Sequence, residues 1–269
     1  MKTFLSNPSI PPLLSPEPVS ELLDPLFDAA EESENLIGSR HPVLIGSRRH
    51  EIPKFMLLGA RGGGKPIRIA LFAGLDAGVP ESVAALARLL LQLELNPALA
   101  RDYALFAYPV VNLLGFEADK PAPLRAFEAR YGSERSDPDV RFFKEELRKW
   151  FFDGIITLRV DPHAEGFYAT VRSEVLAQEV LLPAMATIGK ALPVAEKPIR
   201  VRRADRQARL SDYAQGRLAP PADIRPYPFE IELFVPGSAT AEEHVRGLFV
   251  ALHEILRNYR NVISHAQNL

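Results

Sequence analysis

Residues Ile67–Glu117 read IRIALFAGLDAGVPESVAALARLLLQLELNPALARDYALFAYPVVNLLGFE, and the architecture can be inferred outward from them. The apolar runs Ile67–Ala73 and Tyr103–Val110 are typical of buried strands. Between them, Pro80–Leu93 spaces its apolar residues three and four apart, which predicts an amphipathic helix. Strands that alternate with helices indicate an α/β fold, with a mixed central sheet and helices on both faces.

The same alternation continues on both sides of this segment. We expect further helices at Val19–Phe27, at Asp137–Trp150 with Asp137 as the N-cap, at Val171–Leu192 with a break at Pro183, and at Thr240–Tyr259. We expect further strands at Lys54–Gly59, Gly154–Leu158 and Phe229–Val235. The glycine-rich segment 60–66 is predicted to be the turn of a hairpin between Lys54–Gly59 and Ile67–Ala73.

Composition limits the classes of protein that need to be considered. Residues 1–18 contain five prolines and are expected to form an extended arm, and residues 19–269 are expected to form a single domain. The chain has no cysteine, so thiolate ligands and a cysteine nucleophile are excluded. The net charge of -2 gives no argument for nucleic acid or for an anionic membrane. No apolar run approaches the ~20 residues that span a bilayer, and a soluble cytoplasmic protein is expected.

Several segments carry a resemblance to a known family. They are His50–Arg68, Ile67–Glu117, Phe151–Tyr168 (FFDGIITLRVDPHAEGFY) and the C-terminal residues from Pro228, which begin PFEIELFVPG. Together they resemble the zinc carboxypeptidase clan, in the branch that includes succinylglutamate desuccinylase and aspartoacylase. The resemblance covers most of the chain and implies the phosphorylase/hydrolase-like fold of that clan.

The resemblance also implies positions for a zinc ion and for a catalytic base. In the family, a His and a Glu in the turn after the first core strand and a His after a later strand bind zinc. Asp76, Val79 and Arg159 stand at these three positions, and Phe234 stands at the position of the general-base Glu. Val79 and Phe234 have no donor atom, and an arginine stays protonated and repels a cation. We therefore expect no zinc and no other cofactor.

The remaining family positions complete a predicted remnant cleft. Asn112 follows Tyr108-Pro109 and resembles the Asn of a P-x-x-N stretch, and Glu128 lies where the family's substrate-binding D-L-N-R run falls. The residues that we assign to the remnant cleft are Asp76, Val79, Asn112, Glu128, Arg159, Asp161, His163 and Phe234.

The leading hypothesis is a catalytically inactive homologue with a binding or regulatory role. Asp76 and Arg159 stand where two ligands of one metal would stand, so we expect them to form an ion pair in that space, with Phe234 and Val79 filling the remaining volume. The partner is left open: a small molecule or peptide in the cleft, an active paralogue, or a second copy of the chain. A membrane or a nucleic acid is not expected.

Two alternatives remain. In the first, an active metallo-amidohydrolase or carboxypeptidase uses rearranged ligands from Asp76, Asp161, His163 and Glu165. In the second, Lys197–Arg209 (KPIRVRRADRQAR) binds an anion or a nucleic acid, although no aromatic residue is present there for base stacking.

The glycine-rich segment also matches part of a phosphate-binding motif. Gly59–Lys65 matches G-x-x-x-x-G-K, but Pro66 follows where a phosphate-binding loop needs Ser or Thr, and a β-rich run stands where that loop needs a helix. We therefore expect no nucleotide site in this segment.

Overall fold

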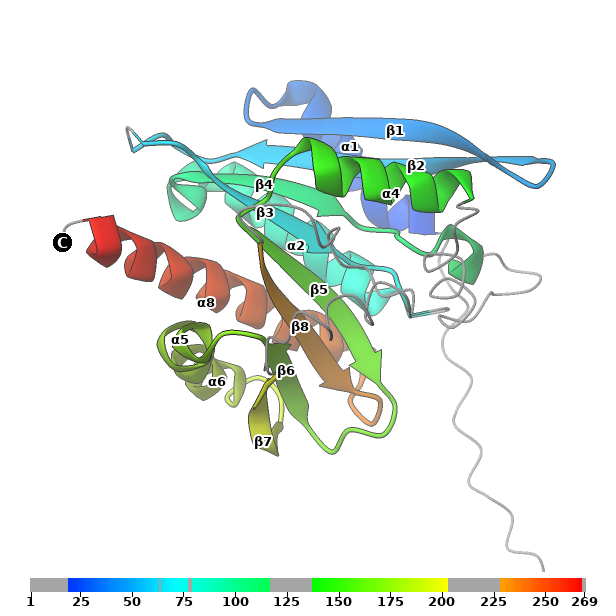
Figure 1. Ribbon diagram of the computed structural model, residues 1–269. Helices are drawn as coiled ribbons and strands as arrows, with labels where there is room; N and C mark the ends of the chain where they lie inside the picture. The colour runs from blue at the N-terminus through cyan, green and yellow to red at the C-terminus, as the bar shows by residue number, and fades with distance from the viewer. Residues whose placement is uncertain (1–18, 63, 77–78, 117–136, 203–227, 268–269) are drawn as a thin grey trace, which may run out of the picture.

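The computed structural model describes residues 19–62, 64–76, 79–116, 137–202 and 228–267. Within these residues, eight strands form one sheet in the order β1-β2-β4-β3-β5-β8-β6-β7 (Figure 1). The strands are β1 Leu36–Ile45, β2 Arg48–Leu58, β3 Ile67–Phe72, β4 Tyr103–Tyr108, β5 Gly154–Asp161, β6 Phe167–Val171, β7 Val194–Val201 and β8 Phe229–Pro236. The longer helices are α1 Val19–Glu32, α2 Glu81–Leu95, α4 Pro138–Lys149, α6 Leu182–Ile188 and α8 Ala241–Gln267.

The centre of the sheet is parallel and its two flanks contain antiparallel pairs. Strand β3 pairs in parallel with both β4 and β5, and β5 pairs in parallel with β8. On one flank β2 runs antiparallel to β4, and on the other β6 runs antiparallel to β8. The predicted mixed sheet is therefore confirmed. The carboxyl ends of β3, β5 and β8 meet at one edge, which is where open α/β sheets bind ligands.

Alternate residues of the central strands face two separate cores. Ile69 and Leu71 of β3 pack with the apolar faces of α1, α2, α6 and α8, whereas Ala70 and Phe72 pack beneath α4. Because successive side chains of a strand point to opposite faces, helices cover both sides of the sheet, as predicted. Figure 1 shows α4 on the opposite side of the strands from α1 and α2.

The predicted glycine hairpin is wrong. The segment Lys54–Gly59 falls at the end of β2, which pairs with β4 rather than with β3. Strand β4 lies between the two, so the glycine-rich segment crosses from one neighbour of β4 to the other. Gly59 is required by packing, because a Cβ there would stand 1.6 Å from the carbonyl oxygen of Ala100.

Other boundaries also differ from those expected. Strands β1, β6 and β7 were not predicted, and Val171 ends β6 instead of starting a helix. The expected break at Pro183 takes the form of a π-helical turn at Ala177–Leu181, directly before α6. A π turn redirects backbone carbonyls, and the buried Asn258 of α8 donates from Nδ2 to the carbonyl of Val180 at 3.1 Å.

Candidate functional site

The turn that follows β3 is fixed by contacts to the end of β4. Gly74 has a φ of +62°, and a Cβ there would stand 2.6 Å from the carbonyl oxygen of Pro109. Its N–H donates to Oγ of Ser82 at 3.0 Å. The fully buried Asn112 donates from its backbone N–H to the Gly74 carbonyl at 2.9 Å and from Nδ2 to the Leu75 carbonyl at 3.2 Å. Asn112 is therefore a support for the turn that presents Asp76.

Asp76 uses both carboxylate oxygens on the end of β5. Oδ1 accepts from Nε of Arg159 at 3.3 Å, and Oδ2 accepts from the backbone N–H of Val160 at 2.8 Å. The Arg159 and Asp76 side chains retain 15% and 16% exposure, so the pair is largely withdrawn from water. The ion pair expected from the sequence is present, in the turn and strand end where the family resemblance implies two zinc ligands.

Phe234 lies across from Arg159 in the register of β5 and β8, and across from Tyr168 in the register of β8 and β6. Its ring stacks on Tyr168, with centroids 4.6 Å apart and planes 9° from parallel. The guanidinium carbon of Arg159 is 5.7 Å from the Phe234 centroid, and that of Arg200 is 3.6 Å from the Tyr168 centroid. Arg200, Tyr168, Phe234 and Arg159 thus form a cation–aromatic column across four strands.

Asp161 is held by hydrogen bonds from its own strand end and from β6. The Tyr168 hydroxyl donates to Oδ2 at 2.8 Å, and the backbone N–H of His163 donates to Oδ1 at 2.9 Å. Burial alone would raise the pKa of Asp161, but these two hydrogen bonds hold that pKa below its ordinary value. Burial and the hydrogen bond to Asp161 raise the pKa of Tyr168 to about 12. His163 and Glu165 are exposed.

These residues do not fit a zinc ion. A catalytic zinc needs three protein ligands with free lone pairs and an open coordination position. Of the three implied ligand positions, only Asp76 carries a metal donor, and the Arg159 guanidinium that pairs with it brings a positive charge to the site. The half-buried Val79 contributes only a backbone N–H, which donates to the carbonyl of Asp76 at 3.3 Å. Across the described residues, no three His, Asp or Glu side chains are grouped so that they could hold a metal.

Two of the sequence predictions concern residues that lie partly or wholly outside the described part of the chain. Glu128 lies outside the described residues, so its membership of the remnant cleft remains a prediction. Only the first part of Lys197–Arg209 is described, as the second half of β7 and the residue after it. There Arg200 covers Tyr168, and Arg202 pairs with Glu232 at 2.7 Å, so two of the basic side chains are used within the fold.

Tyr168 and Arg200 were missed from the sequence. Both lie on strands that were not predicted, β6 and β7. The short run Phe167–Val171 is a signal for a strand, since it is aromatic and β-branched, but it has no strong alternation of polarity. Its pairing with β8, which brings Tyr168 over Phe234, is a long-range feature of the sheet.

Comparison with known proteins gives matches in structure but not in sequence. No family model matches the chain, and no curated protein matches it either. The metallo-carboxypeptidase of Burkholderia cenocepacia matches with a TM-score of 0.68 and 12% identity, over 93% of this chain and 70% of that chain. A candidate metallopeptidase of Shewanella denitrificans matches with a TM-score of 0.62 and 15% identity, over 88% and 89%. Bovine thrombin-activatable fibrinolysis inhibitor, in complex with tick carboxypeptidase inhibitor, matches with a TM-score of 0.56 and 13% identity, over 90% and 97%.

The chain therefore has a zinc carboxypeptidase-like fold. Identities this low establish the fold alone, because one fold hosts many functions. The desuccinylase and aspartoacylase branch remains a prediction from the sequence. None of the described helices has both the length and the apolar character needed to cross a bilayer.

Proposed function

We propose that this chain is a catalytically inactive relative of zinc-dependent carboxypeptidases and deacylases, with a binding or regulatory role through its remnant cleft. The observation that carries the proposal is the Asp76–Arg159 ion pair at the carboxyl edge of the sheet. It occupies two of the positions from which the family resemblance implies zinc ligation. A metal entering there would have to displace a guanidinium from a carboxylate and would still lack donors from Val79 and Phe234.

The position of the general base also lacks a side chain that could take part in hydrolysis. A metal-bound water needs a carboxylate to take its proton, and Phe234 cannot do this. Phe234 is instead committed to stacking between Tyr168 and Arg159. The column of charged and aromatic side chains replaces a reactive centre with a fixed surface. On this proposal the surface recognises a small molecule or a peptide, or supports association with an active paralogue or a second copy.

A hydrolysis assay tests the loss of activity. The purified protein is equilibrated with zinc and incubated with a panel of N-acyl amino acids and of peptides that differ in their C-terminal residue. We expect no turnover above that of a chelator-treated preparation. Turnover that the chelator abolishes would overturn the proposal.

The same assay examines the alternative with rearranged ligands. If activity is found, the variant His163→Ala should lose it when His163 is a ligand. His253→Ala serves as a matched control, because His253 lies on α8 and pairs with Glu254 of the same helix at 3.5 Å.

A further inference from the structure

Phe151 combines an unfavourable backbone conformation with an exposed side chain. Its φ is +47°, in the left-handed region that a bulky aromatic residue rarely adopts. The residue is 60% exposed, so the strain is not offset by burial of the ring in the core. Asp102 is the other non-glycine residue with a positive φ in the described part of the chain, and an aspartate tolerates this region. Strained residues of this kind cluster where their conformation serves a function.

The chain on both sides of Phe151 is fixed by contacts. Arg68 donates from Nη1 to the carbonyl of Trp150 at 3.2 Å, and its backbone N–H donates to Oδ2 of Asp153 at 2.8 Å. The N–H of Asp153 donates to the carbonyl of Arg68 at 2.8 Å, and Phe152 is buried in the core beneath α4. The ring of Phe151 is therefore displayed from a well-held turn, directly after the end of α4.

The outer side of α4 is basic. Its apolar residues pack into the core beneath it, and Glu145 is its one exposed acid. Four basic residues of the helix are exposed or half-buried: Arg141, Lys144, Arg148 and Lys149. The first three are spaced three and four residues apart, so they lie on one face of the helix. Phe151 thus follows a helix whose outer face carries an excess of positive charge.

Most of these cations have no carboxylate partner. Within the described residues, no ion pair involves the side chains of Arg68, Arg141, Arg148 or Lys149. Arg68 instead bonds a carbonyl, and Nζ of Lys149 lies 4.9 Å from the ring centroid of Trp150. Burial, and then the charge of Arg148, lower the pKa of Lys144, as expected where like charges gather. The net charge of -2 for the whole chain therefore does not describe this surface.

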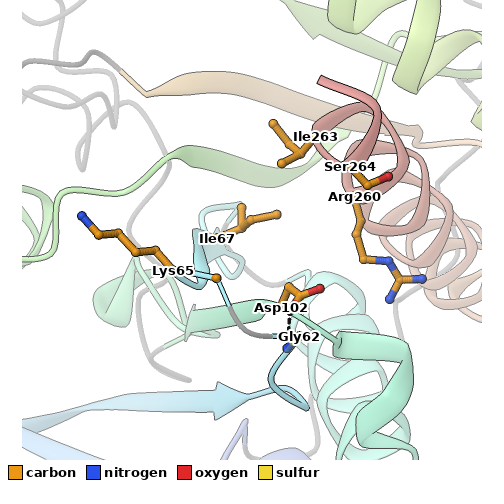
Figure 2. Close-up of a pocket in the computed structure, with 8 residues that line it drawn as sticks. Gly62, Lys65, Ile67, Asp102, Arg260, Ile263 and Ser264 are labelled. Atoms are coloured by element: carbon orange, nitrogen blue, oxygen red, sulfur yellow. Dashed lines mark hydrogen bonds between the residues drawn. The ribbon is translucent and has the colours of Figure 1, made fainter. Parts of the chain in front are cut away.

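A further cation lies at the same end of the sheet. Lys65 is exposed just before β3, and Figure 2 shows its side chain directed away from α8, which covers the other side of the sheet. Phe151 precedes β5, whereas Arg159 lies near the other end of that strand. The basic surface is thus separate from the remnant cleft, and an inference about it does not depend on the function proposed for the cleft.

We propose that the outer side of α4, together with Phe151 and Arg68, docks onto an anionic membrane surface. The basic side chains contact anionic headgroups, and the ring of Phe151 enters the interface between headgroups and acyl chains. Phe151 is the only exposed aromatic residue in the described ranges, whereas a nucleic acid strand is held by several aromatic side chains. A second copy of the same surface is disfavoured, because its cations would face those of the first.

The binding is expected to be weak and reversible. Each Lys or Arg close to an anionic membrane strengthens partitioning by about fivefold. Burial of an aromatic ring strengthens it by about tenfold or more. Together these contributions predict half-saturation at roughly millimolar accessible lipid, which is weaker than the binding given by a single acyl chain.

Flotation of the full chain with lipid vesicles tests the proposal. One set of vesicles is an equimolar mixture of phosphatidylcholine and phosphatidylglycerol, and the other is phosphatidylcholine alone. We expect binding to the anionic vesicles alone, and its loss in high salt, because salt screens charges that are exposed to water. Phe151→Asn should weaken the binding by about tenfold, and Arg148→Gln by about fivefold. Because asparagine tolerates a positive φ, Phe151→Asn should unfold at a temperature no lower than the unsubstituted protein.

Two matched control variants lie on helices that cover the other side of the sheet. Leu182→Asn removes an apolar side chain of α6 that is 52% exposed, and Arg246→Gln removes a cation of α8 that bonds the carbonyl of Ala191. Both variants should bind anionic vesicles as the unsubstituted protein does, and thermal unfolding establishes that each is folded. Three results would refute the proposal: no binding of the unsubstituted chain to anionic vesicles, equal losses in the control variants, or tighter binding to a single-stranded oligonucleotide at the same salt concentration.

Discussion

The Asp76 carboxylate bridges the turn after β3 and the end of β5 by accepting from Nε of Arg159 at 3.3 Å and from the Val160 N–H at 2.8 Å. In a zinc carboxypeptidase-like fold, the family resemblance implies that a metal joins these same two segments. Here an ion pair links them, and its cation is the Arg159 side chain instead of a metal ion. On the function proposed above, the scaffold is retained while the chemistry of the site is changed.

Breaking this pair tests its contribution to stability. Arg159→Ala leaves the Asp76 carboxylate largely buried without its cation, and we expect the free energy of unfolding to fall by about 3 kcal/mol. Asp76→Ala strands Arg159 and also removes the acceptor of the Val160 N–H, so the double variant does not return to the stability of the unsubstituted protein. We expect a coupling energy of about 1–2 kcal/mol from urea unfolding of the four proteins. Strictly additive losses would mean that the pair contributes nothing.

Alkaline pH should weaken the fold through buried tyrosines. Burial and the hydrogen bond to Asp161 raise the pKa of Tyr168 to about 12, and burial raises that of Tyr259 to about 12. An unfolded tyrosine ionises near pH 10. The unfolded chain therefore loses these protons first, so stability is complete below about pH 10 and falls as pH rises toward about 12. Urea midpoints across this range should fall less steeply in Tyr168→Phe, and an unchanged slope in that variant would argue against the hydrogen-bonded tyrosine.

Glu146 of α4 anchors a second buried cluster. Its Oε2 accepts from Nζ of Lys54, from the Tyr108 hydroxyl at 2.6 Å and from Nε1 of Trp150 at 2.9 Å. Glu146→Ala strands the lysine, and we expect a loss of about 3–5 kcal/mol in the free energy of unfolding.

The fluorescence of the same variant gives an independent readout, because Trp150 is the single tryptophan of the chain. Its emission should shift toward longer wavelengths in Glu146→Ala as its environment loosens. The exposed Glu145 lies on the same helix, and Glu145→Ala should change neither property by a measurable amount. Equal effects of the two substitutions would contradict the role assigned to Glu146.

Local patterns were sufficient to predict the central elements. The runs at Ile67–Ala73 and Tyr103–Val110 correspond to β3 and β4, and the amphipathic segment Pro80–Leu93 between them corresponds to α2, which extends to Leu95. The ion pair of Asp76 and Arg159 was also predictable, because two positions that the family resemblance assigns to one metal must be close in space. Each of these predictions depends on a short segment, or on two positions that the resemblance already assigns to one site.

Long-range pairing was not predictable from the same patterns. The glycine-rich segment 60–66 has the composition of a hairpin turn, yet β4 inserts between the strands that it connects. Nothing local to Phe167–Val171 indicates that it pairs with β8, so the stacking of Tyr168 on Phe234 could not be expected. Strand neighbours depend on the whole sheet, whereas turn chemistry reports only on a few residues.

Zinc stoichiometry, measured by mass spectrometry after equilibrium dialysis, tests the central claim most directly. A catalytic site holds one zinc per chain, and we expect less than about a tenth of an equivalent on the unsubstituted protein. The variant that combines Asp76→His, Val79→Glu and Arg159→His, dialysed in parallel, is expected to approach one equivalent, because it restores three donors at the family's ligand positions. About one equivalent on the unsubstituted protein would contradict the account, since a metal would then be held by residues other than the ion pair described.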